Sequence, residues 1–330
     1  MSTRESGSAS PVLPPLQVAD GNSLDWDEQC DVLVVGWGAA GACAALEART
    51  QGADVMIADR FTGGGASAKS GGVVYAGGGT RHQLAAGFND SPEAMFDYLK
   101  HETHNVISDD TLRRFCADSV GNLAWLEGHG APYSHQMPPG GKTSYPSDGY
   151  YLYYSGNELV PAYGGALPPA PRGHRTVGKG QGGAVLYAHL KSACLRAGAR
   201  PLLQAAARRL GTDPQGRVLG VEFYCLPAGS KPALLHARLA ARAERLQNFA
   251  SGYCNKLRHK VRQLERDFAQ PRRVQARKGV ILSTGGFIFN RQLLDQHAPK
   301  FVRNFKVGAT GCDGSGLRLG QSCGCLLYTS

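Results

Sequence analysis

The sequence feature that most constrains the fold is a glycine pattern between an apolar run and an alanine-rich segment. Apolar residues 31–35 lead directly into Gly36-Trp-Gly38-Ala-Ala-Gly41, and alanine-rich residues 42–51 follow. A second apolar run, 55–58, ends at Asp59, 18 residues past the third glycine. Short apolar runs of this kind are typical of buried parallel strands. The pattern predicts a strand–helix–strand unit with the glycines at its first turn.

Each part of this unit has a role in holding a dinucleotide. Gly36 permits the turn, Gly38 lets the backbone approach a pyrophosphate, and Gly41 allows the helix to pack closely. The N-terminus of the helix attracts the anion, and Asp59 is placed to hydrogen-bond a ribose. We therefore predict an α/β, Rossmann-like domain with a central parallel sheet, in preference to a purely structural turn.

A second glycine-rich stretch favours FAD over NAD as the dinucleotide. Residues 61–80 read FTGGGASAKSGGVVYAGGGT and directly follow the second predicted strand. NAD domains normally need no second cradle here. The isoalloxazine of FAD has an edge that backbone amides and small hydroxyls, such as those of Ser67 and Ser70, can meet.

The remaining chain fits one flavin-binding domain. We expect a loose, Ser- and Pro-rich tail over residues 1–24 and an FAD-binding domain over 25–330. The further elements expected are a helix over 183–197, strands over 201–208 and 217–224 around a turn, a β-meander, a strand over 278–283, and an Asp-Gly turn over 311–316 before a helix.

The positive charge is concentrated in residues 231–277. This segment holds 12 Lys or Arg and 3 acids, whereas the rest of the chain has 24 basic and 23 acidic residues. Because the basicity is local, a nucleic-acid surface is not indicated. Apolar residues at helical spacing predict a basic helical insert, broken into a hairpin near Gly252. A solvated basic face is the simpler interpretation; contact with an acidic membrane surface or a protein partner is the alternative.

Composition narrows the class of protein further. No apolar run approaches the roughly 20 residues that span a bilayer, and the N-terminal residues lack a signal-peptide pattern. The nine cysteines include no CxxC pair, and the histidines are dispersed. We therefore expect a cytoplasmic protein without disulfides and without a metal site.

Taken in order, these stretches resemble the FAD-binding half of the fumarate reductase and 3-ketosteroid dehydrogenase flavoprotein superfamily. The runs GACAALEAR (41–49), SGG and GGGT (70–80), YSGNE (154–158) and PAPRGH (169–174) are most similar to the Δ4-(5α)-3-ketosteroid dehydrogenases. The resemblance covers about residues 28–324 without the basic insert. It implies a flavoprotein oxidoreductase that removes hydrogen from adjacent ring carbons of a 3-oxosteroid, with hydride passing to the flavin.

The resemblance also implies a set of FAD contacts, named here by position in this chain: Gly36, Gly38, Gly41, Asp59, Arg60, Gly65, Ala66, Ser67, Ser70, Gly71, Gly72, Ala206 (through its backbone), Thr284, Gly285 and Asp313. Asp59 departs from the family, which generally has Glu there. In the succinate dehydrogenase branch a histidine binds the flavin covalently, and Gly65 stands at that position here. FAD is therefore expected to be noncovalent.

The superfamily places its capping domain and much of its catalytic machinery beyond the Asp-Gly turn. We therefore expect an N-terminal fragment without the capping domain, inactive alone, whose last few residues are foreign. Within it, 7 of the 13 tyrosines lie between Tyr133 and Tyr163. Tyr154, which heads the YSGNE run, is the catalytic candidate, although tyrosines also suit an aromatic-faced hairpin. His174 is more readily interpreted as a structural hydrogen-bonding group.

Two other functions stay open from the sequence. One is a soluble fumarate-reductase-like enzyme that acts on a small dicarboxylate through Arg and His. The other is a noncatalytic FAD-binding or partner-binding module that docks through the basic insert.

Overall fold

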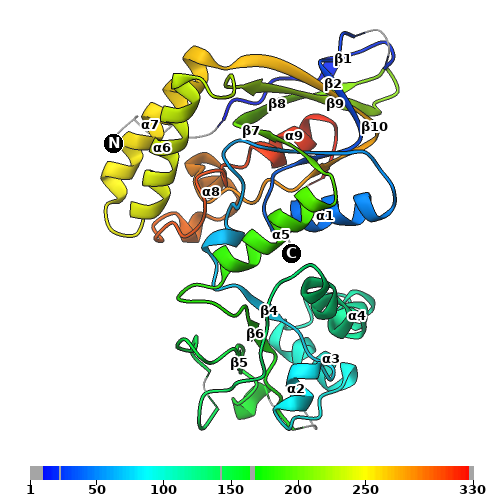
Figure 1. Cartoon of the computed structure of the whole chain (residues 1–330), viewed down its shortest axis with the longest axis vertical. Coiled ribbons are helices and arrows are strands. Elements are labelled where there is room, and N and C mark those ends of the chain that lie inside the picture. Colours follow the sequence, from blue (N-terminus) through cyan, green and yellow to red (C-terminus); the bar gives the residue numbers. More distant parts are fainter. Residues whose placement is uncertain (1–9, 22–23, 142, 164–167, 327–330) are drawn as a thin grey trace. The chain divides into compact units, whose positions relative to one another are not determined.

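The computed structural model describes residues 10–21, 24–141, 143–163 and 168–326. It divides into two compact units (Figure 1). Unit 1 combines the chain up to Ala66 with the chain from Cys194 onward, and unit 2 runs from Ser67 to Ala193.

Unit 1 is built on a sheet with the strand order β1-β8-β9-β10-β2-β3-β7 (Figure 1). Strands β10, β2, β3 and β7 pair in parallel, as the sequence predicts, whereas β8, β9 and β10 form an antiparallel meander. The bounds are β1 Leu16–Gln17, β2 Glu28–Val35, β3 Val55–Asp59, β7 Arg200–Leu203, β8 Ala205–Thr212, β9 Val218–Cys225 and β10 Gln270–Leu282.

The core of unit 1 lies where the parallel and antiparallel halves of the sheet meet. Leu33, Met56, Phe223 and Val274, from four different strands, are all almost completely buried. Helix α1 (Ala39–Thr50) packs on β2 and β3 through Ala42 and other small side chains, which allow the helix to approach the sheet closely. The predicted position of the glycine turn between β2 and α1 is confirmed.

The single strand expected over residues 201–208 is divided between two strands, β7 and β8, in the structure. Residues 201–208 are interrupted at Gln204, which adopts a positive φ of 53°. Its backbone N–H donates to the Phe61 carbonyl at 3.1 Å, outside the β8–β9 ladder. The resulting bend lets β7 pair with β3 while β8 pairs with β9. Periodicity alone does not reveal such a bend, because both halves remain apolar and extended.

A loose tail was expected over residues 1–24; residues 1–9 and 22–23 lie outside the described residues, and residues 10–21 are ordered. Ser10 and Val18 are buried, and β1 pairs with the end of β8. Backbone N–H groups of Leu13 and Val18 donate to carbonyls of Arg208 and Thr212. β8 would otherwise present unpaired backbone groups at this edge, and the segment satisfies them.

The basic segment forms two helices, α6 (Lys231–Leu246) and α7 (Ser251–Phe268), that lie side by side in Figure 1. Leu257 and neighbouring apolar residues form the buried contact between the two helices. The chain turns over residues 247–250, so Gly252 lies in the first turn of α7 instead of breaking the helix. The C-terminal limit of the expected insert is wrong, because residues 270–277 form the first half of β10.

Unit 1 also contains α8 (Arg291–His297) and α9 (Ser315–Ser322). Unit 2 has a three-stranded antiparallel sheet with the order β4-β6-β5, and helices flank it. Its elements are β4 Val73–Tyr75, α2 Arg81–Ala85, α3 Pro92–Glu102, α4 Asp109–Gly128, β5 Leu152–Tyr153, β6 Gly173–Arg175 and, reaching the boundary between the units, α5 Gly183–Arg196.

Side-chain hydroxyl groups cap the N-termini of three helices in unit 2. Thr80, Ser91 and Ser108 accept backbone N–H groups in the first turns of α2, α3 and α4. At α2 the Gln83 side chain completes a capping box. The tyrosine-rich region forms no extended hairpin, since β5 is its only strand in the part that the structure describes.

The β9–β10 contact generates a stability prediction. A Cβ atom on Gly220 would lie 2.3 Å from the Val274 carbonyl oxygen and 2.6 Å from the Trp26 ring. Gly220→Ala should therefore lower the free energy of unfolding by about 1–3 kcal/mol, measured by urea denaturation. Gly279→Ala in β10 is the control, because its new methyl group meets nothing within 4 Å. Equal effects of the two substitutions would contradict the packing described here.

Candidate functional site

The glycine turn between β2 and α1 is a place where backbone packs directly against backbone. Gly36 has a φ of 104°, and a Cβ atom there would lie 2.4 Å from the Ser283 carbonyl oxygen. A Cβ atom on Gly41 would lie 2.0 Å from the Gly36 oxygen. Ser283 Oγ donates to carbonyl oxygens of Val35 and Gly36 and so fastens the turn to the end of β10. Only glycine fits at both positions.

The N-terminus of α1 carries no side-chain cap. Its N-cap, Gly38, supplies no side-chain hydrogen bond, and the first turn carries no acidic residue. The helix dipole places partial positive charge at this end of the helix. The turn and helix thus provide a cradle for a phosphate group.

Asp59 holds the glycine turn in place. Its two carboxylate oxygens accept backbone N–H groups of Trp37 at 2.9 Å and Phe61 at 2.7 Å. Gly36 N–H also donates to the Ala58 carbonyl at 2.8 Å, so the end of β3 fixes the turn from two sides. The carboxylate stands beside the anion cradle, where the sequence predicts a ribose contact.

Arg60 is the centre of a buried ionic cluster. Its guanidinium makes two hydrogen bonds of 2.8 Å to Glu265 of α7 and one of 2.9 Å to Asp313. Asp313 also accepts N–H groups of Ser10 and Ser315, so each of its oxygens has a partner. The cluster joins the end of β3 to α7, the N-terminal segment and the start of α9.

Burial alone would raise the pKa of Glu265, but the Arg60 guanidinium and the hydrogen bond from His236 outweigh it and lower that pKa to about 2. Burial opposes the charged form of Arg60 as well, yet Glu265 and Asp313 raise its pKa. Sequence reasoning missed Glu265 and His236. The sequence did carry a signal for Glu265, which is an acidic residue in a strongly basic helix and lies between two of the apolar residues, Leu264 and Phe268, that recur at helical spacing.

Two of the remaining candidates in unit 1, Thr284 and Gly65, lie beside the same turn. Thr284 packs against Gly316, where a Cβ atom would overlap the threonine hydroxyl. Gly285 and Gly65 both have positive φ, and a Cβ atom on Gly65 would lie 4.0 Å from Gly38 Cα. Ala206 pairs with Tyr224 in the meander. Ala66 ends unit 1.

Four predicted contacts, Ser67, Ser70, Gly71 and Gly72, lie in unit 2. A Cβ atom on Gly72 would lie 2.2 Å from the Gly182 carbonyl carbon, and one on Gly183 would lie 2.4 Å from the carbonyl oxygens of Ser67 and Ser70. This loop therefore packs directly on the start of α5.

Tyr145, also missed from the sequence, fixes the same loop. Its hydroxyl donates to the Gly71 carbonyl at 2.7 Å and accepts the Gly182 N–H at 3.2 Å. The excess of glycine over residues 178–183 was the signal that pointed to the start of α5.

The catalytic candidate, Tyr154, is buried in unit 2 with its ring edge-on to Phe88, and a Cβ atom on Gly141 would lie 3.2 Å from that ring. Burial, with a smaller contribution from Glu158, raises the pKa of Tyr154, so its phenol is neutral at physiological pH. A neutral buried phenol can donate a hydrogen bond to a carbonyl oxygen.

His174 is a buried structural group, as the sequence suggests. Its Nε2 lies 2.9 Å from Thr80 Oγ1 and its Nδ1 lies 3.2 Å from the Arg172 carbonyl oxygen. Burial lowers the pKa of His174 to about 4. The neighbouring arginines pair elsewhere, Arg172 with Asp90 and Arg175 with Asp148.

Among residues 10–21, 24–141, 143–163 and 168–326, no three His, Cys, Asp or Glu side chains are grouped closely enough to hold a metal ion. No helix within those ranges has both the length and the apolar character needed to cross a bilayer.

Comparisons with known proteins agree with this geometry. A family described as the FAD binding domain matches residues 31–329. The chain is 46% identical over 328 residues to the 3-oxo-5-alpha-steroid 4-dehydrogenase of Comamonas testosteroni, and the match covers 96% of this chain and 59% of that protein.

Two solved structures share the fold. The 3-ketosteroid-delta4-(5alpha)-dehydrogenase from Rhodococcus jostii RHA1, solved with 4-androstene-3,17-dione, matches with a TM-score of 0.76 and 28% identity over 94% of this chain and 57% of its own. A flavocytochrome c3 fumarate reductase matches over 91% of this chain and 41% of its own, with a TM-score of 0.62 and 20% identity. The chain thus spans little more than half of the two steroid dehydrogenases and less than half of the fumarate reductase.

The surroundings of His174 predict a pH dependence of stability. The folded-state pKa of about 4 lies below the ordinary histidine value of 6.5, so between these values the unfolded chain binds a proton that the folded chain does not. The free energy of unfolding should therefore fall as the pH is lowered from 6.5 to 4, by about 1 kcal/mol per pH unit from this residue. His174→Gln should flatten the slope in urea titrations, whereas exposed His135→Gln should leave it unchanged. Parallel slopes for both variants would refute the assignment.

Proposed function

The chain belongs to the family of FAD-binding domains, and from this premise we propose that it binds FAD for the dehydrogenation of 3-oxo-5α-steroids. The observation that carries the proposal is 46% identity, over 96% of the chain, to a 3-oxo-5-alpha-steroid 4-dehydrogenase. The Rhodococcus structure, which was solved in complex with a steroid, supports the same substrate class at a TM-score of 0.76.

The residues present fit FAD. The N-terminus of α1 has no side-chain cap and no acidic residue in its first turn, so with Gly36, Gly38 and Gly41 beside it this end of the helix suits the pyrophosphate. Asp59 is assigned to the ribose. The other assigned contacts are Arg60, Gly65, Ala66, Ser67, Ser70, Gly71, Gly72, the Ala206 backbone, Thr284, Gly285 and Asp313. When bound, FAD supplies the acceptor for a hydride taken from a C–H bond.

The protein's contribution to that chemistry is positioning and proton handling. Loops tied by short backbone contacts, such as Gly72 on Gly182, can hold a planar ring without rearrangement. Tyr154 is assigned to hydrogen-bond the substrate's carbonyl, because its phenol stays protonated at neutral pH. The nine unpaired cysteines accord with a cytoplasmic location, which we include in the proposal.

FAD should be held noncovalently, because Gly65, at the position of the covalent histidine in related flavoproteins, has no side chain to form a bond. Purified protein reconstituted with FAD should release all of its flavin into the supernatant after acid precipitation, measured by absorbance. Flavin remaining in the washed precipitate would contradict this. A Gly65→His variant, handled in parallel, controls for incomplete extraction.

A chimera tests the substrate class. The matching 59% of the Comamonas enzyme would be replaced by this chain, and dehydrogenation of a 3-oxo-5α-steroid would be followed with an artificial electron acceptor. The chimera should be active, and Tyr154→Phe should lower its kcat by about 100-fold while flavin content stays constant. A chimera that binds FAD but acts only on fumarate would favour the dicarboxylate alternative.

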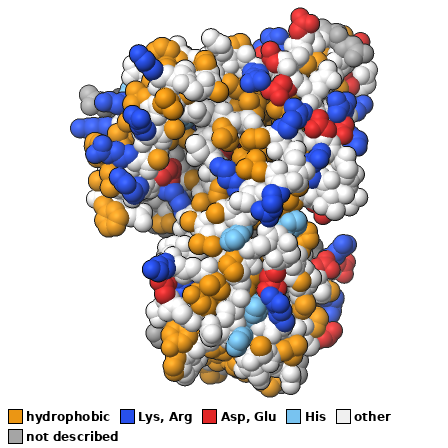
Figure 2. Space-filling model, viewed as in Figure 1, with side chains coloured by type: hydrophobic (Ala, Val, Ile, Leu, Met, Phe, Trp, Pro, Cys, Tyr) orange, Lys and Arg blue, Asp and Glu red, His pale blue; other side chains and the backbone are white. Residues whose placement is uncertain are grey.

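A noncatalytic docking role for the α6–α7 pair is the second candidate. Figure 2 shows Lys and Arg side chains gathered over these helices, and Phe249, in their connecting turn, is 88% exposed. An exposed aromatic beside basic residues suits an acidic membrane surface or protein. If the protein binds anionic vesicles and the Phe249→Ser variant does not, this docking role is favoured. If the protein does not bind them, docking to a membrane is excluded.

A further inference from the structure

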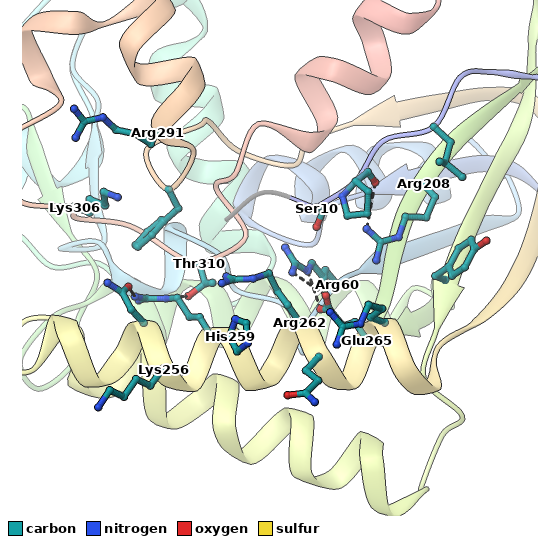
Figure 3. A pocket seen from close by; sticks show the side chains of 18 residues that line it. Ser10, Arg60, Arg208, Lys256, His259, Arg262, Glu265, Arg291, Lys306 and Thr310 are labelled. Atoms are coloured by element: carbon teal, nitrogen blue, oxygen red, sulfur yellow. Dashed lines mark hydrogen bonds and ion pairs between the residues drawn. The ribbon is translucent and has the colours of Figure 1, made fainter. Parts of the chain in front are cut away.

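Unit 1 contains a cavity of about 990 Å³ between α7, the N-terminal segment and the chain around α8. A volume of this size accommodates a ligand as large as a nucleotide. Figure 3 shows Ser10, Arg60 and Arg208 at one end and Lys306 toward the other, with His259 and Arg262 extending from α7 between them. Of the predicted FAD contacts, only Arg60 lines this cavity.

The lining is strongly cationic. It includes eight Lys or Arg side chains and a single carboxylate, that of Glu265. Glu265 is already engaged by Arg60, while Arg266 and Arg291 pair with Asp267 and Asp295 outside the lining. Within the described ranges, no carboxylate pairs with the remaining five cations, which are Arg208, Lys256, Arg258, Arg262 and Lys306.

Two of these cations are buried as well as unpaired. Arg208 and Arg258 are 6% and 5% exposed. Arg208 donates to the Pro11 carbonyl at 3.2 Å, and Arg258 bonds Thr310, Asn255 and Gln247, so all their partners are uncharged. The charges of Glu265 and Asp313 near Arg208, and of Glu244 near Arg258, offset only part of the cost of burial. A buried guanidinium without a hydrogen-bonded counterion destabilises the empty protein.

The cations also repel one another. Burial first, and then the nearby charge of Arg60, lowers the pKa of Arg208 and of Arg262, while the charges of Glu265 and Asp313 raise it by less. Burial likewise lowers the pKa of Arg258. In addition, the buried Ser10 hydroxyl at the edge of the cavity has no hydrogen-bond partner in the described chain. A hydroxyl and several guanidinium groups facing one space are the donors that phosphate oxygens accept.

FAD does not account for this charge. Its pyrophosphate is assigned to the N-terminus of α1, and its adenine and isoalloxazine are uncharged rings. A single inorganic anion would fill only a small part of the cavity and reach few of the cations, which are spread from β8 to the loop after α8. The ligand must therefore carry several negative groups along its length.

We propose that this cavity binds a small molecule with a chain of two or more phosphate groups, as a ligand additional to FAD. The shared chemistry is the phosphate chain, which occurs both in inorganic polyphosphates and in nucleoside di- and triphosphates. The proposal stands on the unpaired cations of unit 1 and does not depend on the steroid assignment.

The test is calorimetric titration of the FAD-saturated protein with tripolyphosphate in metal-free buffer. One equivalent should bind, more weakly as salt is added. Arg208→Gln and Arg262→Gln should each weaken binding about ten-fold or more, the loss expected for a charged hydrogen bond. Arg238→Gln, the same change on an exposed residue of α6 outside the lining, should bind as the parent does. If ATP binds with the same affinity as tripolyphosphate, the phosphate groups determine the affinity. If ATP binds more tightly, the nucleoside also contacts the protein.

Thermal unfolding of the ligand-free protein gives a second readout that does not depend on choosing the right ligand. Removing an uncompensated cation should raise the Tm of Arg262→Gln above that of the parent, while Arg238→Gln leaves it unchanged. The proposal is overturned if no saturable binding occurs, if binding is equal in the Arg208 and Arg238 variants, or if Arg262→Gln lowers the Tm.

Discussion

The close approach of three backbone segments at Gly36, Gly41 and Ser283 is the constraint on which unit 1 depends. The carbonyl oxygens of Gly36 and Ser283 occupy the space that Cβ atoms would need, so the turn exists only with glycine at both positions. Because the turn is this tight, α1 starts immediately against the end of β10. The N-cap of α1 supplies no side-chain hydrogen bond, and the helix dipole leaves partial positive charge at this end.

Charged residues then fix the elements around this turn. Asp59 ties the turn to β3, and Arg60, the next residue, ties β3 to α7 and to the loop before α9. The helix pair is therefore not a peripheral arm alone, since Glu265 belongs to the ionic cluster beside the proposed cofactor site. The cost of burying Arg60 is offset by two carboxylates that hydrogen-bond to it, whereas Glu265 and Asp313 act on Arg208 and Arg262 only through their charge, and the pKa of both arginines stays lowered. This asymmetry separates a structural cluster from a binding cavity.

Much of the cofactor domain could be predicted from the sequence, because its signals are local. The β2–α1 turn, the apolar β3 and the Asp-Gly turn before α9 each depend on neighbouring residues, and the family match over residues 31–329 confirms the fold class. What the sequence did not reveal depends on distant partners. The start of β10 at Gln270 is set by its pairing with Cys225, and the order of residues 10–18 by the free edge of β8. Glu265 and Tyr145 acquire their roles only from groups far along the chain.

A crystal structure of the chain with FAD bound tests the central claim most directly. The account predicts the FAD pyrophosphate within hydrogen-bond distance of the N–H groups at the start of α1, with the adenosine ribose beside Asp59 and the Arg60–Glu265 pair intact. A pyrophosphate located among Arg208, Arg258 and Arg262, with the glycine turn unliganded, would contradict it.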